Sequence, residues 1–264
     1  AATEELANRI RSHGLLTLTG PSGCGKSSLL QAGVIPLLQD REKGVDHSGE
    51  VRTLPVLFRP GGEPLRSLVG ALAAVVDEAS HLLIQRAIFD GDADRTASLL
   101  GDWCLRENKR LVLILDQGEE LLTLCSDVKE RGVFADILTE IGGSAASPLR
   151  LVLSLREDFF GPMSVIEPWR SRFTRQVVVL SVPEESALQR TLAGPASLFG
   201  YQFEDHALLE EMVEAVRDQP AALALLQFCA DRMWDRRDRH RKMVTREAYE
   251  NLGGVEGALA THAS

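Results

Sequence analysis

The stretch "TLTGPSGCGKSSLL" (residues 17–30) decides the fold of this chain. Within it, residues 20–27 match the phosphate-loop pattern G-x-x-x-x-G-K-[ST] without exception, with an apolar run before them and a helical pattern after them. Glycines permit positive φ angles, which let successive backbone N–H groups point at one anion. The N-terminus of the following helix adds partial positive charge. The stretch therefore predicts a loop that binds the phosphates of a nucleoside triphosphate.

Each residue of this loop has an expected role. Lys26 is expected to reach the β- and γ-phosphates, and the Ser27 hydroxyl to coordinate Mg²⁺. Cys24 lies among N–H groups that stabilise a thiolate, so we expect it to react with alkylating agents when nucleotide is absent. The other nucleotide contacts are expected from Gly20, Pro21, Ser22, Gly23, Gly25 and Ser28.

Composition and charge narrow the class of protein. The 264 residues are 44 % hydrophobic, and no run of residues is apolar enough for a membrane span or a secretory signal, so we expect a cytoplasmic protein without a membrane partner. The net charge of −9 disfavours broad binding of nucleic acid. One basic stretch, "WDRRDRHRK" (234–242), could form a local patch, although a solvated helix end is the favoured interpretation.

Short apolar runs alternate with helical patterns, which predicts an α/β fold with a five-stranded parallel sheet flanked by helices. Helical patterns cover 64–79 and 128–141, and after about residue 183 only helical patterns remain. We therefore expect a P-loop domain at 1–183 and a small all-helical lid domain at 184–264, as part of a longer multidomain protein. The expected strands are 14–19, 51–59, 110–116, 149–156 and 176–182.

A second part of the site is predicted at "LVLILDQGEELL" (111–122). Asp116 ends an apolar strand, where ligands of open α/β sheets bind, and is the expected Mg²⁺ carboxylate, acting through water. Gln117 can orient a water but cannot take its proton, so Glu119 is the candidate base and Glu120 the second choice. Glu119 could instead be an acid at a helix start, and Asp116 a turn residue.

An arginine follows the fourth expected strand. Arg156 could contact the γ-phosphate and distinguish triphosphate from diphosphate, because its charge and fork geometry match a pair of phosphate oxygens. Pairing with Glu157 or Asp158 is the alternative. The guanine-specific motif N-K-x-D is absent, which favours ATP and ADP as the nucleotides.

These segments together resemble the STAND class of signal-transduction ATPases, in its bacterial novel STAND branch, often fused to WD-repeat propellers. The resemblance implies a switch: ADP holds a closed monomer, and exchange for ATP opens it into a homo-oligomer that activates an effector. It also implies sensor and effector domains elsewhere in the protein. The segments that carry it are 14–38, 111–122, 151–160, 194–203, 221–237 and 244–263.

Two positions depart from the family pattern. Gly118 stands where the family usually has an aromatic residue, which is expected to loosen the turn after Asp116. Ala224 stands where the lid usually has a second proline after Pro220, so a continuous helix is expected there.

The sequence thus predicts a slow, regulatory ATP hydrolase in bacterial signalling or defence. A scaffold that binds nucleotide without hydrolysis and an AAA+-like ATPase acting on DNA remain alternatives, with a small-molecule kinase as a weaker one.

Overall fold

The structure is a computed structural model that describes residues 2–40, 51–169, 172–217, 219 and 222–260. The chain divides into two compact units, and the predicted phosphate loop interrupts the first of them. The first unit comprises Ala1–Gly20 and Lys26–Leu180, and the second comprises Pro21–Gly25 and Ser181–Ser264.

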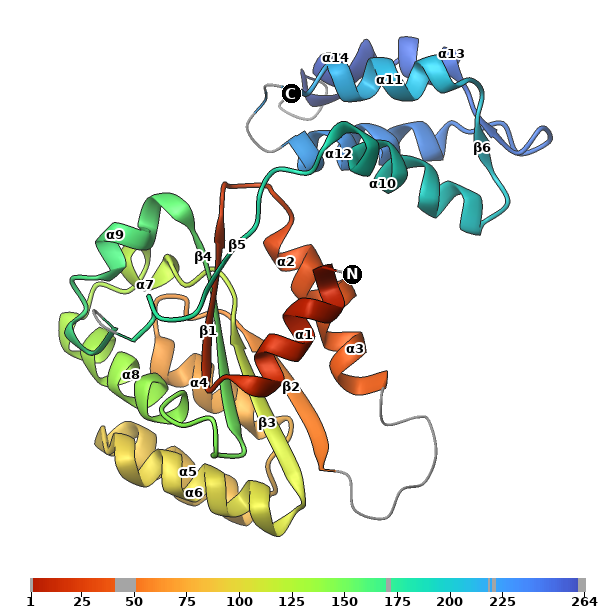
Figure 1. Ribbon diagram of the computed structural model, residues 1–264. Helices are drawn as coiled ribbons and strands as arrows, with labels where there is room; N and C mark the ends of the chain where they lie inside the picture. The colour runs from red at the N-terminus through yellow and green to blue at the C-terminus, as the bar shows by residue number, and fades with distance from the viewer. Residues whose placement is uncertain (1, 41–50, 170–171, 218, 220–221, 261–264) are drawn as a thin grey trace. The chain divides into compact units, whose positions relative to one another are not determined.

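The first unit is built on a five-stranded sheet in the order β2-β3-β4-β1-β5, with every neighbouring pair parallel (Figure 1). The predicted α/β fold with a five-stranded parallel sheet is therefore confirmed. All five strands lie within one residue of their expected ranges except the last, which is shorter. They are β1 (Leu15–Gly20), β2 (Arg52–Phe58), β3 (Lys109–Leu115), β4 (Leu149–Arg156) and β5 (Val177–Val179).

Helices cover both faces of this sheet because its strands are apolar on both sides. On one face Leu18, Ile114 and Val152 pack with Leu30 and Leu38, which follow the phosphate loop. The other face packs against the helices between β2 and β4. The helices and helical turns of this unit are α1 (Ala2–Ser12), α2 (Lys26–Ser28), the π-helix Leu29–Val34, α3 (Ile35–Asp40), α4 (Pro64–Ala73), α5 (Glu78–Asp90), α6 (Ala93–Arg106), α7 (Glu120–Thr123), α8 (Val128–Ile141), the 3₁₀ turns Glu157–Phe159 and Glu167–Trp169, and α9 (Phe160–Met163).

One helix prediction in this unit is too long and one is confirmed. The pattern over 64–79 breaks after Ala73, and α5 starts at Glu78 because the Asp77 carboxylate accepts a hydrogen bond from the Ser80 N–H at 3.0 Å. The predicted helix over 128–141 is α8, with identical bounds.

The second unit is mainly helical but contains one short pair of parallel strands, β6 (Gln202–Phe203) and β7 (Met243–Val244). An all-helical lid is therefore wrong in this detail. The two strands were missed because each has only two residues, too few to show a period in sequence. The helices are α10 (Glu185–Leu198), α11 (His206–Glu214), α12 (Ala222–Asp235), α13 (Arg246–Glu250) and α14 (Gly254–Ala260).

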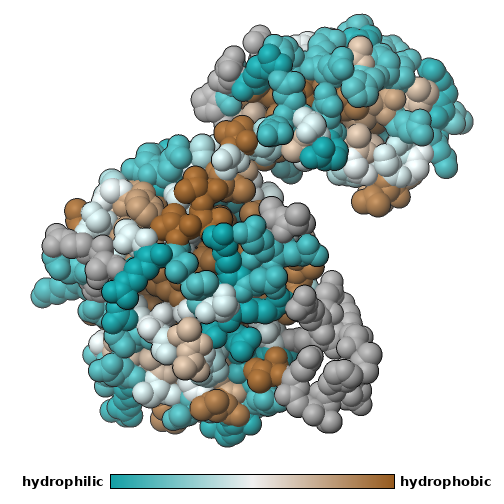
Figure 2. Space-filling view, in the orientation of Figure 1, coloured by the Kyte–Doolittle hydropathy of each residue, from teal (hydrophilic) through white to brown (hydrophobic). Residues whose placement is uncertain are grey.

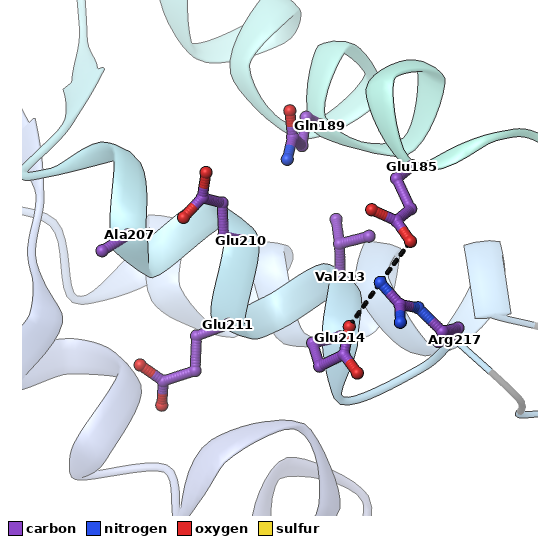
Figure 3. A pocket seen from close by; sticks show the side chains of 8 residues that line it. All are labelled: Glu185, Gln189, Ala207, Glu210, Glu211, Val213, Glu214 and Arg217. Carbon is purple, nitrogen blue, oxygen red and sulfur yellow. Dashed lines mark hydrogen bonds and ion pairs between the residues drawn. The ribbon is translucent and has the colours of Figure 1, made fainter.

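A hollow lies between α10 and α11 (Figure 3). Arg217 holds the two helices together there, since its guanidinium pairs with Glu185 of α10 and, at 2.7 Å, with Glu214 of α11. Glu210 and Glu211 also line the hollow, so it is acidic. No residue lining it belongs to the predicted nucleotide site.

A buried arginine ties the start of β4 to its surroundings. Arg150 is 3 % exposed, and its guanidinium donates to the carbonyl oxygens of Arg11, Ala145, Ser147 and Leu149 at 2.5–3.2 Å. Arg11 lies at the end of α1. Ala145 and Ser147 lie in the loop before β4, and Leu149 is the first residue of β4. Burial lowers the pKa of Arg150, and these carbonyl dipoles offset the cost of holding its charge inside.

We expect Arg150→Met to lower the free energy of unfolding by about 2–4 kcal/mol, because buried carbonyl groups lose a charged donor. The exposed Arg175 provides the matched control, and Arg175→Met is expected to change stability by less than about 0.5 kcal/mol. Chemical denaturation of both variants measures the difference. Equal losses in the two would contradict the anchoring role of Arg150.

Candidate nucleotide site

The carboxyl ends of β1, β3 and β4 meet at one edge of the sheet, and the predicted site residues follow them. β4 lies between β1 and β3, and Gly20 at the end of β1 pairs with Arg156 at the end of β4. Asp116 follows β3 directly, and its N–H donates to the Phe58 carbonyl of β2 at 2.9 Å. The parallel sheet thus gathers residues that are far apart in sequence.

Asp116 carries a buried carboxylate without a partner. Its side chain is 1 % exposed, and neither carboxylate oxygen has a hydrogen-bond partner among the described residues. Such a group is costly unless something compensates its charge. A divalent cation would do so, and Mg²⁺ is commonly held by one or two carboxylates together with substrate phosphates.

Ser154 is a candidate site residue that was not predicted from the sequence. It is 1 % exposed and its hydroxyl also lacks a partner among the described residues. Ser154 belongs to the same face of the sheet as Asp116. Leu113 pairs with Leu151, and Asp116 and Ser154 each lie three residues after their member of this pair. A serine inside the otherwise apolar run "LVLSL" (151–155) was the available signal.

The described residues contain no group of three or more His, Cys, Asp or Glu side chains that could hold a metal ion alone. A cation at Asp116 would therefore depend on phosphate oxygens and a hydroxyl for its remaining ligands. Ser27, in the first turn of α2, is the residue predicted to supply that hydroxyl. The donor set fits Mg²⁺ bound together with a nucleotide.

Positive φ angles were expected at Gly20, Gly23 and Gly25, and the structure has them at the last two, whereas Gly20 is the last residue of β1. Gly23 and Gly25 have φ angles of 72° and 94°, in the region that favours glycine. Lys26 opens α2 and is 9 % exposed, and its ammonium donates to the Gly20 carbonyl at 2.8 Å. The lysine is thus held at the junction of strand and helix, on the chain segment that would bind phosphate.

The structure limits the predicted reactivity of Cys24, because its side chain is 4 % exposed. All four cysteines are described by the structure, and each is buried and outside any disulfide. Burial raises the pKa of the Cys104 and Cys229 thiols to about 11, so these two stay protonated near neutral pH.

Glu119 and Glu120 point to different neighbours. Glu119 Oε2 accepts the backbone N–H of Arg156 at 3.2 Å, which holds this carboxylate at the end of β4. Glu120 Oε2 accepts the N–H of Gly61 at 3.1 Å, in the loop after β2. Of the two, Glu119 therefore lies at the strand ends that carry the other site residues, which supports it as the candidate base.

Arg156 pairs with Asp158, which was the alternative to a γ-phosphate contact in the sequence analysis. Its guanidinium forms a two-pronged pair with the Asp158 carboxylate, at 3.0 and 2.7 Å, and lies over the Phe159 ring at 5.5 Å. Contact with a γ-phosphate would require this arginine to leave Asp158. Its sensor role stays a prediction.

The turn after Asp116 is tight, contrary to the loosening expected at Gly118. The Gly118 N–H donates to the Ser154 carbonyl at 2.7 Å, and a Cβ at this position would lie 2.7 Å from Leu153 Cδ1. Gln117, just before it, has a φ of 55°, which is unfavourable for a residue other than glycine. The turn is therefore closely packed and strained.

We expect Gly118→Ala to lower the free energy of unfolding by about 1–2 kcal/mol, because its Cβ would press on Leu153 and on the Ser154 carbonyl. Gly132 in α8 provides the control, since a Cβ there would meet no atom within 4 Å. Gly132→Ala is expected to raise stability by about 0.5–1 kcal/mol through helix propensity. Urea denaturation compares the pair, and a neutral Gly118→Ala would contradict the tight turn.

A further prediction concerns the unpartnered carboxylate. Without nucleotide and Mg²⁺, Asp116→Asn should raise the free energy of unfolding by about 1 kcal/mol, because it removes a buried, uncompensated charge. The same variant should lose the thermal stabilisation that Mg-ATP gives the wild type. Thermal unfolding with and without Mg-ATP measures both effects. A variant less stable than wild type in the absence of ligand would contradict this account.

A phosphate loop after β1 of a parallel sheet, with an acid after β3 and one strand between the two, defines the class of P-loop NTPases. Residues 1–264 match the family described as Novel STAND NTPase 1, and the chain belongs to this family. The resemblance seen in the sequence is confirmed, and the chain is a nucleotide-binding NTPase module. No curated protein matches the chain.

Solved structures share the fold at low sequence identity. The chain is similar to the Aeropyrum pernix ORC2 protein in its ADP form, with a TM-score of 0.65 and 14 % identity over 98 % of this chain and 67 % of that one. It is similar to the Aeropyrum pernix ORC1 protein in complex with DNA, with a TM-score of 0.60 and 18 % identity over 98 % of this chain and 64 % of that one. C. elegans PCH-2 gives a TM-score of 0.57 and 12 % identity, over 100 % of this chain and 70 % of that one.

Two expectations about partners can be compared with these findings. Two of the similar structures, those of Aeropyrum pernix ORC1 and of Drosophila ORC, contain DNA, and at 18 % identity each of them shows the shared fold alone. Within the part of the chain that the structure describes, no helix is long and apolar enough to cross a bilayer.

Proposed function

We propose that this chain is the nucleotide-binding module of a STAND-type switch in bacterial signalling or defence. It binds Mg-ATP or ADP and hydrolyses ATP slowly, and the nucleotide state controls assembly into a homo-oligomer and activation of an effector. The observation that carries the proposal is the buried, unpartnered carboxylate of Asp116, at the same sheet edge as the strand that leads into the phosphate loop.

Each candidate residue would have its own role in binding and hydrolysis. The N–H groups of the loop and the ammonium of Lys26 would bind the phosphates, and Ser27 and Asp116 would hold Mg²⁺. Bound Mg²⁺ would neutralise charge that develops on the phosphate oxygens. Glu119 would take the proton of the attacking water through Oε1, since its Oε2 accepts the Arg156 N–H.

Arg156 would couple phosphate state to the rest of the protein. Its pair with Asp158 has exposed side chains, 42 % and 53 %, and such a pair contributes only about 0–1 kcal/mol. A γ-phosphate could therefore draw the arginine away from Asp158 at small cost. ATP and ADP would then favour different states of the module, as a switch requires.

The proposal extends to the organisation of the whole protein. Residues 1–183 would form the nucleotide-binding domain and 184–264 the lid domain, with sensor and effector domains elsewhere in the protein as partners. Ala224 lies in the first turn of α12, in agreement with a continuous helix there, whereas Pro220 lies outside the described residues.

A scaffold that binds nucleotide without hydrolysis is the second candidate function. The observation that favours it is the Glu119 hydrogen bond to Arg156, which holds the candidate base by one of its two oxygens. Both functions require nucleotide binding, and only turnover separates them. The DNA-bound similar structures keep action on DNA as a third alternative.

Phosphate release from ATP tests the proposed function in wild type, Lys26→Ala, Glu119→Gln and Glu120→Gln. Slow turnover in wild type should be abolished by Lys26→Ala through lost binding. Glu119→Gln should bind Mg-ATP normally but lower the hydrolysis rate by about 100-fold or more, because an amide cannot accept the proton.

Glu120→Gln is the matched control, because its carboxylate contacts Gly61 rather than the end of β4, and it should retain most of the wild-type rate. Equal loss in the two glutamate variants would contradict the assignment of the base. Bound nucleotide with no turnover in the wild type would favour the scaffold.

A further inference from the structure

The second unit carries an ordered basic turn, residues 236–242, with sequence RRDRHRK. α12 ends at Asp235, so the basic stretch 234–242 lies at a helix C-terminus as expected, and residues 236–242 form a turn after the helix. Asp238 and Met243 close it with two backbone hydrogen bonds of 2.9 and 3.0 Å. The Asp238 carboxylate also accepts the N–H groups of His240 and Arg241, both at 2.9 Å. The turn therefore holds a defined shape.

Most positive charges of the basic turn are not neutralised by acids among the described residues. It contains five Arg or Lys residues and one acid, Asp238, whose carboxylate is engaged by the turn's own backbone. Among the described residues, Arg241 has Glu204 as an ion-pair partner at 3.8 Å, whereas Arg236, Arg239 and Lys242 have none and are exposed. By contrast, Arg217 and Arg246 of the same unit are each paired with two acids. The turn is thus a local positive centre in a chain with a net charge of −9.

An aromatic cluster of Phe199, Tyr201 and Trp234 adjoins the basic turn. Arg237 lies over the Trp234 ring at 4.2 Å and over the Tyr201 ring at 5.3 Å. The centroid of the Phe199 ring lies 5.8 Å from that of the Trp234 ring, and Phe199 is the exposed member of the cluster, with 71 % of the residue exposed. Figure 2 shows an apolar area on this unit at the end of α10, where Phe199 and the 87 % exposed Leu198 lie.

The aromatic cluster and the basic turn adjoin each other on the surface. The Gln202 N–H donates to the Lys242 carbonyl at 3.1 Å, which joins the two segments by a backbone hydrogen bond. A Cβ on Gly200 would lie 3.9 Å from Lys242 Nζ, so the ammonium lies beside the residue that follows Phe199. The exposed ammonium of Lys242 and the exposed Phe199 ring therefore belong to backbone segments that are joined by a hydrogen bond.

We propose that this surface binds single-stranded nucleic acid. Arg236, Arg239 and Lys242 bind backbone phosphates, and Phe199 stacks on one base. Cations that follow a backbone next to an aromatic ring are the combination by which proteins bind single strands without sequence preference. A single strand fits better than a duplex, because only an unstacked base can lie against the ring. An acidic peptide would use the charges but would not need the ring.

Fluorescence anisotropy with a labelled oligothymidine of about 20 nucleotides, at about 50 mM salt, tests this surface. Arg239→Ala/Lys242→Ala should weaken binding and flatten the slope of log K against log salt by about 1.4, the value for two phosphate contacts on a single strand. Phe199→Ala should weaken binding by about tenfold with an unchanged salt slope, because stacking of one base is lost. Phe199→Trp should retain binding.

The control is Arg66→Ala/Arg86→Ala, which removes two exposed charges from the first unit. It should leave binding unchanged within about twofold, since those arginines lie outside the surface. All the substituted side chains are exposed, so the variants should fold like the wild type, which thermal unfolding checks.

Several outcomes would overturn the proposal. No binding of the oligonucleotide at about 50 mM salt would do so, as would an equal effect of the control variant. Binding that is insensitive to Phe199→Ala, with poly-glutamate competing as well as the unlabelled strand, would indicate an acidic protein partner instead. Binding to phosphatidylserine vesicles that Leu198→Ser abolishes, without oligonucleotide binding, would indicate a membrane surface. None of these measurements depends on nucleotide turnover.

Discussion

The hydrogen-bonded pairing of β4 between β1 and β3 is the constraint on which the candidate nucleotide site depends. The carboxyl ends of parallel strands lie at the same edge of a sheet. The phosphate loop therefore follows β1 at the edge where Asp116 follows β3 and Arg156 ends β4, although about ninety residues separate the loop from Asp116. The buried guanidinium of Arg150 secures the other end of β4. Any shift in the β4 register would move Ser154 and Arg156 relative to both neighbours.

The site concentrates unfavourable features in three consecutive residues. Asp116 buries an unpartnered carboxylate, Gln117 has a positive φ, and Gly118 leaves no room for a side chain. Backbone hydrogen bonds to Phe58 and Ser154 hold this turn from both sides, which allows the strain to persist. Such a turn lowers the stability of the folded protein. This cost is typical of a binding site, where a bound ligand supplies the compensating charge.

Charge is distributed unevenly over the second unit. The hollow between α10 and α11 is acidic, and its arginine is fully engaged by two glutamates. In the basic turn at 236–242, three of the cations, Arg236, Arg239 and Lys242, have no acidic partner among the residues that the structure describes. A net charge summed over the chain averages these two surfaces, which explains why it is a weak guide to the partners of either one.

The sequence by itself determined the class of this protein. The phosphate loop, the apolar strands and α8 each depend on contiguous residues, whose spacing and propensity are visible in sequence. Only the tertiary structure decided which neighbour each functional side chain contacts. Glu119 and Glu120 are adjacent in sequence, yet one accepts a hydrogen bond from Arg156 and the other from Gly61. A related reason explains four features that were not predicted: the break between α4 and α5, the β6-β7 pair, Ser154 and the aromatic cluster beside the basic turn. Each depends on one capping bond, a two-residue pairing or contacts between distant segments, and none of these produces a periodic pattern in the sequence.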